Sequence, residues 1–251
     1  MLPGPARLSL DALARLVRAE QIGELPDVLA PPAVWQPSAD EDAAEDRAKA
    51  EIARLGWRDR RGRLEPEVAA SLAVLCRATA EFSGWIGGGT GVLAAASGRV
   101  AVLAVATGQQ VTLKRAPRKR LPEALVAQLP DVPPGQGTAV SVPLEEMRQA
   151  AKWRGQEEGV VTARPLPRGD LRQALHVSEL PVLDSGELWV AVRDGLGRRR
   201  RIPYPLCYAD TESGRYFTVA TVSDNGDVWV LVAPAAPAAL VAKLRELHQS
   251  L

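Results

Sequence analysis

The sequence predicts an α+β fold in which antiparallel strands follow one another along the chain. The clearest observation is the stretch at residues 186–216, which has the pattern of a three-stranded meander with two turns. In its first strand Leu188, Val190 and Val192 occupy alternate positions, and a period of two is typical of a strand with one buried face. Further apolar segments, separated by glycine-containing turns, predict four more strands within residues 81–115.

An internal repeat gives the fold its second feature. The hexapeptide ALVAQL at residues 124–129 recurs as ALVAKL at residues 239–244, and each copy follows a strand-rich segment. The same order of elements in both halves favours a duplicated α+β unit. Two such units can join their sheets edge to edge and leave the helices in two clusters. We therefore expect one domain over residues 1–251, with an N-terminal half at 1–135 and a C-terminal half at 136–251.

The N-terminal half begins with helices and continues with strands. Ser9 can cap the first helix, and Ser38 opens the second with Glu41 as its capping-box partner. Pro66 stands in the first turn of the third helix, where its missing N–H is harmless. The expected helices are residues 9–20, 38–55, 65–79 and 122–129, and the expected strands are residues 81–86, 91–96, 99–106 and 109–115.

The C-terminal half has the same mixture, with the meander near its centre. In the meander's second turn, Asp210 can bond the backbone of its own turn and Gly214 can take a left-handed conformation. Arg215 follows the turn and can reach back to Asp210 as an ion pair. The other expected elements are strands at residues 138–142 and 227–233 and helices at residues 143–153, 170–180 and 237–247.

Composition excludes a strong global charge. The 251 residues carry 31 Lys+Arg and 30 Asp+Glu, a formal net charge of +1, so no general field draws the chain to nucleic acid or a membrane. No apolar run has the roughly 18 residues of a membrane span, and the N-terminus lacks the pattern of a signal peptide. We expect a cytoplasmic protein in which Cys76 and Cys207 are buried thiols, although one disulfide is also compatible with the sequence.

The sequence offers little catalytic chemistry. The glycine run at residues 87–91 lacks the lysine and following helix of a phosphate-binding loop and fits a hairpin turn. The two histidines, His176 and His248, have too few partners for a nucleophile triad or a zinc site. We expect His248, near the C-terminus, to carry a partial positive charge that suits the helix dipole. We therefore expect no enzyme, no cofactor and no metal.

Four consecutive arginines at residues 198–201 are the main basic feature. Successive residues of a strand face opposite sides, so the four side chains do not form one patch. Few aromatic residues surround them, which disfavours a surface for stacking bases. Protection of an edge strand by charge, or ion pairing across the sheet, is the favoured interpretation. A regulator with affinity for nucleic acid is a weaker alternative.

The residues Asp210-Thr211 and Gly214-Arg215-Tyr216 form a DT-x-x-GRY pattern, which follows a Gly-Arg-x-Arg segment at residues 197–200. This pattern resembles the signature of the EspG family, the cytosolic chaperones of actinobacterial type VII (ESX) secretion. The resemblance covers nearly the whole chain. Its supporting motifs are Leu25-Pro26 with Leu29, Arg54-Leu55-Gly56 and Ser141-Val142-Pro143.

The resemblance implies a quasi-two-fold α+β fold, with a central antiparallel sheet flanked by two helical bundles. It also implies that the protein binds the exposed apolar tip of a helical PE–PPE heterodimer and keeps it soluble for secretion, as covering apolar residues prevents self-association. Mycobacterial members use a long loop between two strands of the first half. Here Ser97-Gly98 makes that connection very short, so the grip lies elsewhere or the client is a different, small helical-hairpin protein.

From these locations we predict two groups of residues. The candidate partner-binding residues are Trp153, Leu171, His176, Val177 and Leu180 on the C-terminal bundle and Arg193 and Arg199 on the sheet. The residues assigned to the fold are Asp210, Thr211, Gly214, Arg215 and Tyr216. The alternative to a chaperone is an interaction module without a secretion client, such as a homodimer formed through an exposed sheet edge.

Overall fold

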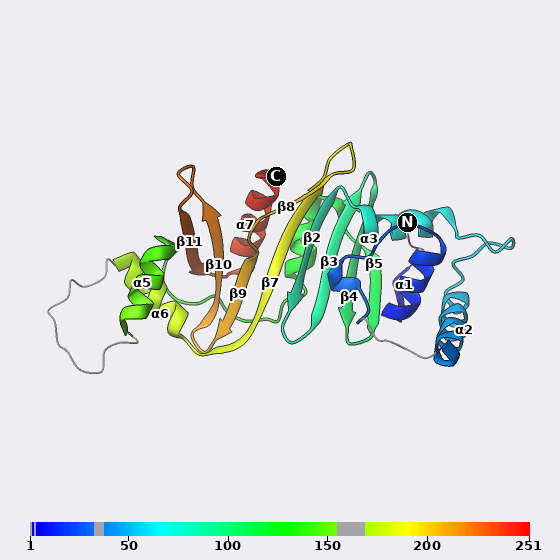
Figure 1. Ribbon diagram of the computed structural model, residues 1–251, viewed down its shortest axis with the longest axis horizontal. Coiled ribbons are helices and arrows are strands. Elements are labelled where there is room, and N and C mark those ends of the chain that lie inside the picture. Colours follow the sequence, from blue (N-terminus) through cyan, green and yellow to red (C-terminus); the bar gives the residue numbers. More distant parts are fainter. Residues whose placement is uncertain (1, 3, 33–37, 155–168) are drawn as a thin grey trace. The chain divides into compact units, whose positions relative to one another are not determined.

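The computed structural model describes residues 2, 4–32, 38–154 and 169–251, with side chains described there except at 38–40, 151, 153 and 154 (Figure 1). Its helices are α1 (Leu10–Ala19), α2 (Ser38–Arg54), α3 (Pro66–Arg77), α4 (Leu121–Val126), α5 (Leu144–Arg154), α6 (Gly169–Glu179), α7 (Pro237–Gln249) and the 3₁₀ turns η1 (Asp27–Leu29) and η2 (Arg118–Arg120). Its strands are β1 (Ala6–Ser9), β2 (Ala80–Ile86), β3 (Thr90–Ser97), β4 (Val100–Thr107), β5 (Gln110–Arg115), β6 (Val140–Pro143), β7 (Val182–Arg193), β8 (Arg199–Arg201), β9 (Leu206–Thr211), β10 (Gly214–Val222) and β11 (Val228–Pro234). The predicted α+β class is confirmed.

The chain divides into two compact units. The first unit comprises Met1–Leu129, Leu188–Ile202 and Leu244–Leu251, and the second comprises Pro130–Glu187 and Pro203–Lys243. The first unit thus includes part of β7, all of β8 and the end of α7. The predicted boundary between the halves at residue 135 stays a prediction.

In the first unit, strands β2 to β5 form an antiparallel meander, and β7 continues the order beside β2. The short strand β1 adds to β5 through the pair Ala6↔Leu113, and the sequence analysis missed it. Four residues directly before a helix give too little periodicity to recognise a strand, although Ala6 and Leu8 are buried and Arg7 is exposed as alternation requires.

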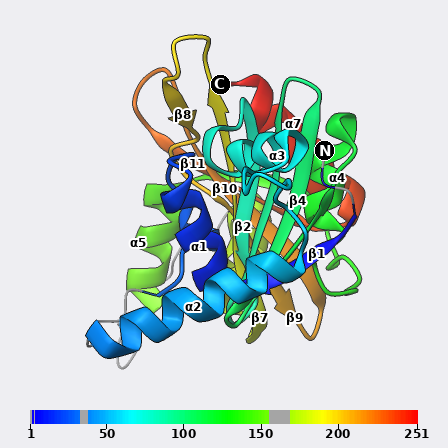
Figure 2. The same ribbon diagram turned by 90° about the vertical axis from the view of Figure 1, so that its right-hand side faces the viewer.

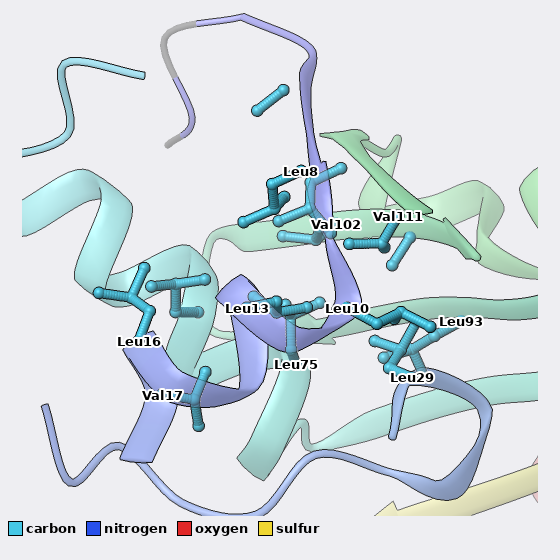
Figure 3. Close-up of a cluster of buried hydrophobic side chains, with 14 of the residues drawn as sticks. Leu8, Leu10, Leu13, Leu16, Val17, Leu29, Leu75, Leu93, Val102 and Val111 are labelled. Atoms are coloured by element: carbon cyan, nitrogen blue, oxygen red, sulfur yellow. The ribbon is translucent and has the colours of Figure 1, made fainter. Parts of the chain in front are cut away.

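Helix α1 packs its apolar stripe on this meander. Figure 3 shows Leu13 beside Leu75 of α3, with Leu93, Val102 and Val111 of the strands close by. Burial of these side chains provides the main driving force for holding α1 in place. As predicted, Ser9 caps the helix: its hydroxyl accepts a hydrogen bond from the N–H of Ala12 at 3.1 Å.

Polar contacts join α1 to α2, which Figure 2 shows side by side. The Ser9 hydroxyl donates to Glu51 of α2 at 2.7 Å. Arg15 pairs with Asp11 on its own helix at 2.8 Å and with Glu41 and Glu45 of α2 at 2.8 and 3.1 Å. The hydrogen bond from Arg15 lowers the pKa of Glu41, and the same carboxylates raise the pKa of the Arg15 guanidinium.

Gln21 ends α1 in a strained conformation, with φ of +52°. The Gln21 N–H donates to the carbonyl of Arg18 and the Ile22 N–H to that of Val17, which is the Schellman pattern that usually places glycine at this position. Replacing Gln21 with glycine is therefore expected to stabilise the protein by about 0.5–1 kcal/mol, because the left-handed conformation loses its steric penalty. Urea unfolding measures the change. Gln21→Ala, which keeps a Cβ, should give no gain, and equal stabilisation by both variants would contradict the explanation.

In the second unit, β9, β10 and β11 form successive hairpins and β6 pairs with β11 through Val142↔Val230. Helices α5 and α6 pack on this part of the sheet. The buried cluster at this contact consists of Val140, Val142 and Val232 of the strands and Ala174 of α6.

The described strands follow the order β1-β5-β4-β3-β2-β7-β9-β10-β11-β6, with β8 paired to β7 outside this path. The first two strands at either end of this order have matching lengths or matching helices after them. The end strands β1 and β6 each have four residues and lead directly into a helix, α1 or α5. The next strands, β5 and β11, each precede a helix with the repeated hexapeptide, in which Leu125 of α4 and Leu240 of α7 are fully buried. The expected duplicated fold with a central antiparallel sheet agrees with this topology.

The middle strand of the predicted meander is interrupted. Strand β8 pairs with β7 through Val192↔Arg200, and β9 begins only after residues 202–205. Pro203 and Pro205 account for the interruption, because proline has no N–H to donate to a ladder of backbone hydrogen bonds. Two separate strands, β8 and β9, therefore stand where the sequence predicted a single middle strand of the meander.

Candidate partner-binding site

The DT-x-x-GRY motif forms a buried ion pair at the β9–β10 hairpin. The guanidinium of Arg215, whose side chain is 3% exposed, donates to both carboxylate oxygens of Asp210 at 2.5 and 2.8 Å. It also donates to the carbonyl of Pro130 at 3.0 Å and lies 4.9 Å from the ring centre of Tyr208. The predicted ion pair is confirmed, and its two charges are held in a site from which water is largely excluded.

The turn itself is shorter than the sequence analysis predicted. Strand β9 continues through Thr211, and Gly214 pairs with it, so only Glu212 and Ser213 form the loop. The Thr211 hydroxyl accepts from the N–H of Ser213 at 3.1 Å and donates to the carbonyl of Gly214 at 2.8 Å. Thr211 thus bonds the turn backbone, while Asp210, which was predicted to do so, is engaged by Arg215.

The motif also fixes the loop that starts the second unit. The N–H of Arg215 donates to the carbonyl of Pro133, and the N–H of Gly135 donates to the carbonyl of Arg215, both at 2.8 Å. The hydroxyl of Tyr216 donates to the carbonyl of Gln136 at 3.1 Å. A Cβ on Gly135 would lie 2.1 Å from the Tyr216 ring, so the loop can approach this closely only because residue 135 is glycine. All five motif residues are buried, which leaves their side chains little surface for a partner.

Four of the predicted partner-binding residues lie on or beside α6. Leu171 and Val177 are half-buried and pack against the apolar cluster of the second unit. His176 is exposed, and Leu180 is half-buried just beyond the helix. The side chain of Trp153, on α5, lies outside the described residues. His176 is the one exposed member of these four, and a role of any of them in partner binding stays a prediction.

Two exposed apolar residues next to α6 were missed. Val182 and Leu183, at the start of β7, are 58% and 65% exposed. The sequence analysis began this strand near Gly186, after the two residues. The available signal was the apolar pair Val-Leu directly after Pro181. Adjacent strand residues face opposite sides of a sheet, so both sides would have to be covered to bury the pair. We define the α6–β7 apolar segment as Val177, Leu180, Val182 and Leu183.

The two predicted arginines belong to the first unit and have partners there. Arg193 donates through one terminal nitrogen to the carbonyl of Gly197 at 2.8 Å. Arg199 makes two hydrogen bonds to Glu81, at 2.7 and 3.2 Å, and this carboxylate raises the pKa of the guanidinium. The first contact closes the β7–β8 hairpin and the second joins β8 to β2. A role of either arginine in partner binding stays a prediction.

The described residues contain no group of His, Cys, Asp and Glu side chains that could hold a metal ion. A hollow of about 830 Å³ lies along α1, but its Asp11 and Glu41 carboxylates are engaged by Arg15. His248 stacks on Phe82 with ring centres 5.3 Å apart, and burial lowers its pKa. Burial thus favours neutral His248, contrary to the charged helix end expected from sequence. Among the described helices, none combines the length and apolar character that a membrane span requires.

Cys76 and Cys207 are both free thiols and half-buried. Burial raises the pKa of Cys76 to about 11 and also raises that of Cys207. In a Cys207→Ser variant at pH 8, we expect iodoacetamide to alkylate Cys76 roughly 100-fold more slowly than in the same chain unfolded in urea, because only the thiolate reacts. Mass spectrometry of timed samples measures both rates. Equal rates would contradict the burial of this thiol.

Comparison with known proteins assigns the chain to a family and finds a similar solved structure. The model of the EspG family matches residues 9–246. The chain belongs to the EspG family. Among solved structures it is similar to the type VII secretion system chaperone EspG5 of Mycobacterium tuberculosis, solved in complex with the PE25–PPE41 dimer. The TM-score is 0.71 at 18% sequence identity, and the match covers 98% of this chain and 96% of the other. A search among proteins with curated functions finds no match.

The short connection noted in the sequence is confirmed in this EspG-family chain. Strand β3 ends at Ser97 and β4 begins at Val100, so two residues join them. The strands on both sides pair in register up to Ser97↔Val100. A two-residue turn of this kind offers no long loop at this position.

Proposed function

We propose that this EspG-family protein is a non-enzymatic chaperone of type VII secretion, which binds a PE–PPE-like heterodimer and keeps it soluble. The observation that carries the proposal is the family match over nearly the entire chain. The similar EspG5 structure, which holds a PE25–PPE41 dimer, gives the class of client. A small helical-hairpin protein is the alternative client, and the proposed location is the cytoplasm.

The α6–β7 apolar segment is the proposed contact surface for the client. Val182 and Leu183 are each more than half exposed, and Val177 and Leu180, which precede them in sequence, are half-buried. Removing such apolar surface from water favours association, and a helical client offers apolar residues at its tip. Exposed His176 and half-buried Leu171 on the same helix are further proposed contacts, with Trp153 of α5 as another predicted contact.

Co-expression with a PE–PPE-type heterodimer tests the proposal. We expect a stable complex on size-exclusion chromatography and a dissociation constant that calorimetry can measure. Val182→Asp with Leu183→Asp should weaken binding by at least about 30-fold, because two charges would be buried against the client's apolar tip. The matched control is Leu196→Asp, since Leu196 is 80% exposed at the turn of the β7–β8 hairpin.

The outcomes separate the possibilities. Unchanged binding by the Val182/Leu183 double variant would remove the α6–β7 apolar segment from the proposal, and loss of binding with Leu196→Asp would move the contact to the hairpin. Binding to a helical-hairpin protein but not to the heterodimer would select the alternative client. Failure to bind either, with a dimer of the pure protein in light scattering, would favour the homodimeric interaction module.

A further inference from the structure

Strand β8 presents an edge to which no strand of the described chain is paired. It pairs with β7 through Ala191↔Arg201, Val192↔Arg200 and Arg193↔Arg199, and it stands outside the main path of the sheet. Figure 1 shows β8 alongside the end of β7. All three of its residues are exposed.

The backbone pattern shows which groups face the open edge. The N–H of Asp194 donates to the carbonyl of Arg198, and the N–H of Ile202 donates to that of Val190. In an antiparallel ladder hydrogen-bonded pairs alternate with unbonded ones, so Arg200 directs its N–H and carbonyl toward β7. Arg199 and Arg201 therefore direct theirs away from β7. The edge offers two N–H donors and two carbonyl acceptors in the spacing that an added strand requires.

The side chains give this edge a positive charge on both faces. Arg199 lies on one face, where Glu81 neutralises it at 2.7 Å. Arg201 lies on the same face with its guanidinium 4.0 Å from the ring centre of Trp189, and no carboxylate of the described residues forms an ion pair with it. On the opposite face Arg200 has no acidic partner among the described residues, and neither does exposed Arg198 just before the strand. Three arginine charges thus stand unneutralised around one open strand edge.

We propose that the β8 edge binds an extended acidic segment of a partner protein, which adds to β8 as a further strand. The backbone groups of Arg199 and Arg201 would pair with the segment, and its carboxylates would meet Arg198 and Arg200 on one face and Arg201 on the other. This site goes beyond the proposed chaperone function and does not depend on it. It differs in location and chemistry from the α6–β7 apolar segment, which is apolar and belongs to the second unit.

The arginines and the open backbone groups disfavour a second copy of this chain, or nucleic acid, as the molecule bound at the β8 edge. Pairing of two β8 edges from two copies of the chain would place arginines opposite arginines, and like charges directly opposite each other destabilise a sheet. Nucleic acid offers phosphate acceptors to the outward N–H groups but no regularly spaced donors to the outward carbonyls. The Trp189 ring, already covered by Arg201, is not free to stack on a base. An acidic strand supplies carboxylates for the arginine side chains and also backbone partners for the outward N–H and carbonyl groups of β8.

Fluorescence anisotropy with the full-length protein tests the site. The probe is a fluorescein-labelled ten-residue peptide with glutamate at alternate positions and threonine between them. We expect saturable binding that weakens with salt. The same peptide with lysine in place of glutamate, and a version N-methylated on one edge so that it cannot pair as a strand, should each bind at least about tenfold more weakly.

Two variants with equal charge change provide the matched comparison. Arg198→Glu with Arg200→Glu should weaken peptide binding about tenfold or more, since the reversed side chains repel the glutamates but leave the backbone edge intact. Arg118→Glu with Lys119→Glu alters two exposed basic residues of η2 in the same unit and should leave binding unchanged. Equal weakening by both pairs would reduce the interaction to general charge and overturn the proposal.

Amide hydrogen exchange gives the decisive readout. Without peptide we expect fast exchange at Arg199 and Arg201 and slower exchange at Arg200, and saturating peptide should slow exchange at Arg199 and Arg201 at least about tenfold. Peptide binding without this protection would overturn the added strand. Tighter binding of a 20-nucleotide DNA than of the peptide, lost on Arg198→Glu with Arg200→Glu, would assign the edge to nucleic acid instead.

Discussion

Replacing Arg215 with alanine is expected to lower the free energy of unfolding by about 3–5 kcal/mol. The substitution leaves the carboxylate of Asp210 buried without its two hydrogen bonds, and the carbonyl of Pro130 loses a donor as well. A loss of this size is a large part of the roughly 5–15 kcal/mol that stabilises a typical domain. Urea denaturation followed by circular dichroism measures it. Partner selectivity should be retained in the folded fraction, because the motif is buried.

A matched control isolates the effect of burial. Arg245 makes an ion pair with Glu123 at 2.6 Å, but its side chain is half exposed, and Arg245→Ala should destabilise by no more than about 1 kcal/mol. Removing both charges together, in Asp210→Leu with Arg215→Met, should recover much of the loss because no buried charge is left unpaired. A fully stable Arg215→Ala protein would contradict the structural role of this ion pair.

The prediction from sequence succeeded where the deciding contacts are local. Arg215 and Asp210 are five residues apart across one turn, so their pairing could be read from spacing alone. The same Arg215 also bonds Pro130, which is 85 residues away in sequence, and no local pattern indicates that contact. Strand β1 was missed for a related reason, since its pairing with β5 joins residues about 100 positions apart.

At the candidate partner-binding surface, too, local features could be predicted from sequence and features that depend on the whole fold could not. Leu171 and Val177, which were predicted as partner contacts, are half-buried on α6 and pack against the second unit's buried cluster. Exposure of Val182 and Leu183 depends on what the rest of the fold leaves uncovered, and an apolar pair after a proline has the same appearance in sequence whether buried or exposed. The sequence therefore predicts that an apolar segment exists there but not that it faces solvent.

Replacing Gly214 with alanine is expected to destabilise the protein by about 3 kcal/mol or more. Gly214 has φ of +102°, a conformation that side chains rarely adopt. A Cβ there would lie 2.8 Å from the nitrogen of Gly135, the carbonyl oxygen of Pro133 and the carbonyl carbon of Pro134. These are backbone atoms, so no side-chain rotation relieves the contact, and the loop held by Arg215 has to move away.

Gly226 separates the two causes of this loss. It has a similarly positive φ of +86° at the β10–β11 turn, but a Cβ there would meet nothing within 4 Å. Gly226→Ala should therefore show only the conformational penalty, about 1–2 kcal/mol, and the excess loss in Gly214→Ala measures the close approach of the loop. Paired urea titrations give both values. If the two variants lost equal stability, the contact between residue 214 and the loop would contribute nothing, and the DT-x-x-GRY motif would have to be explained by its ion pair alone.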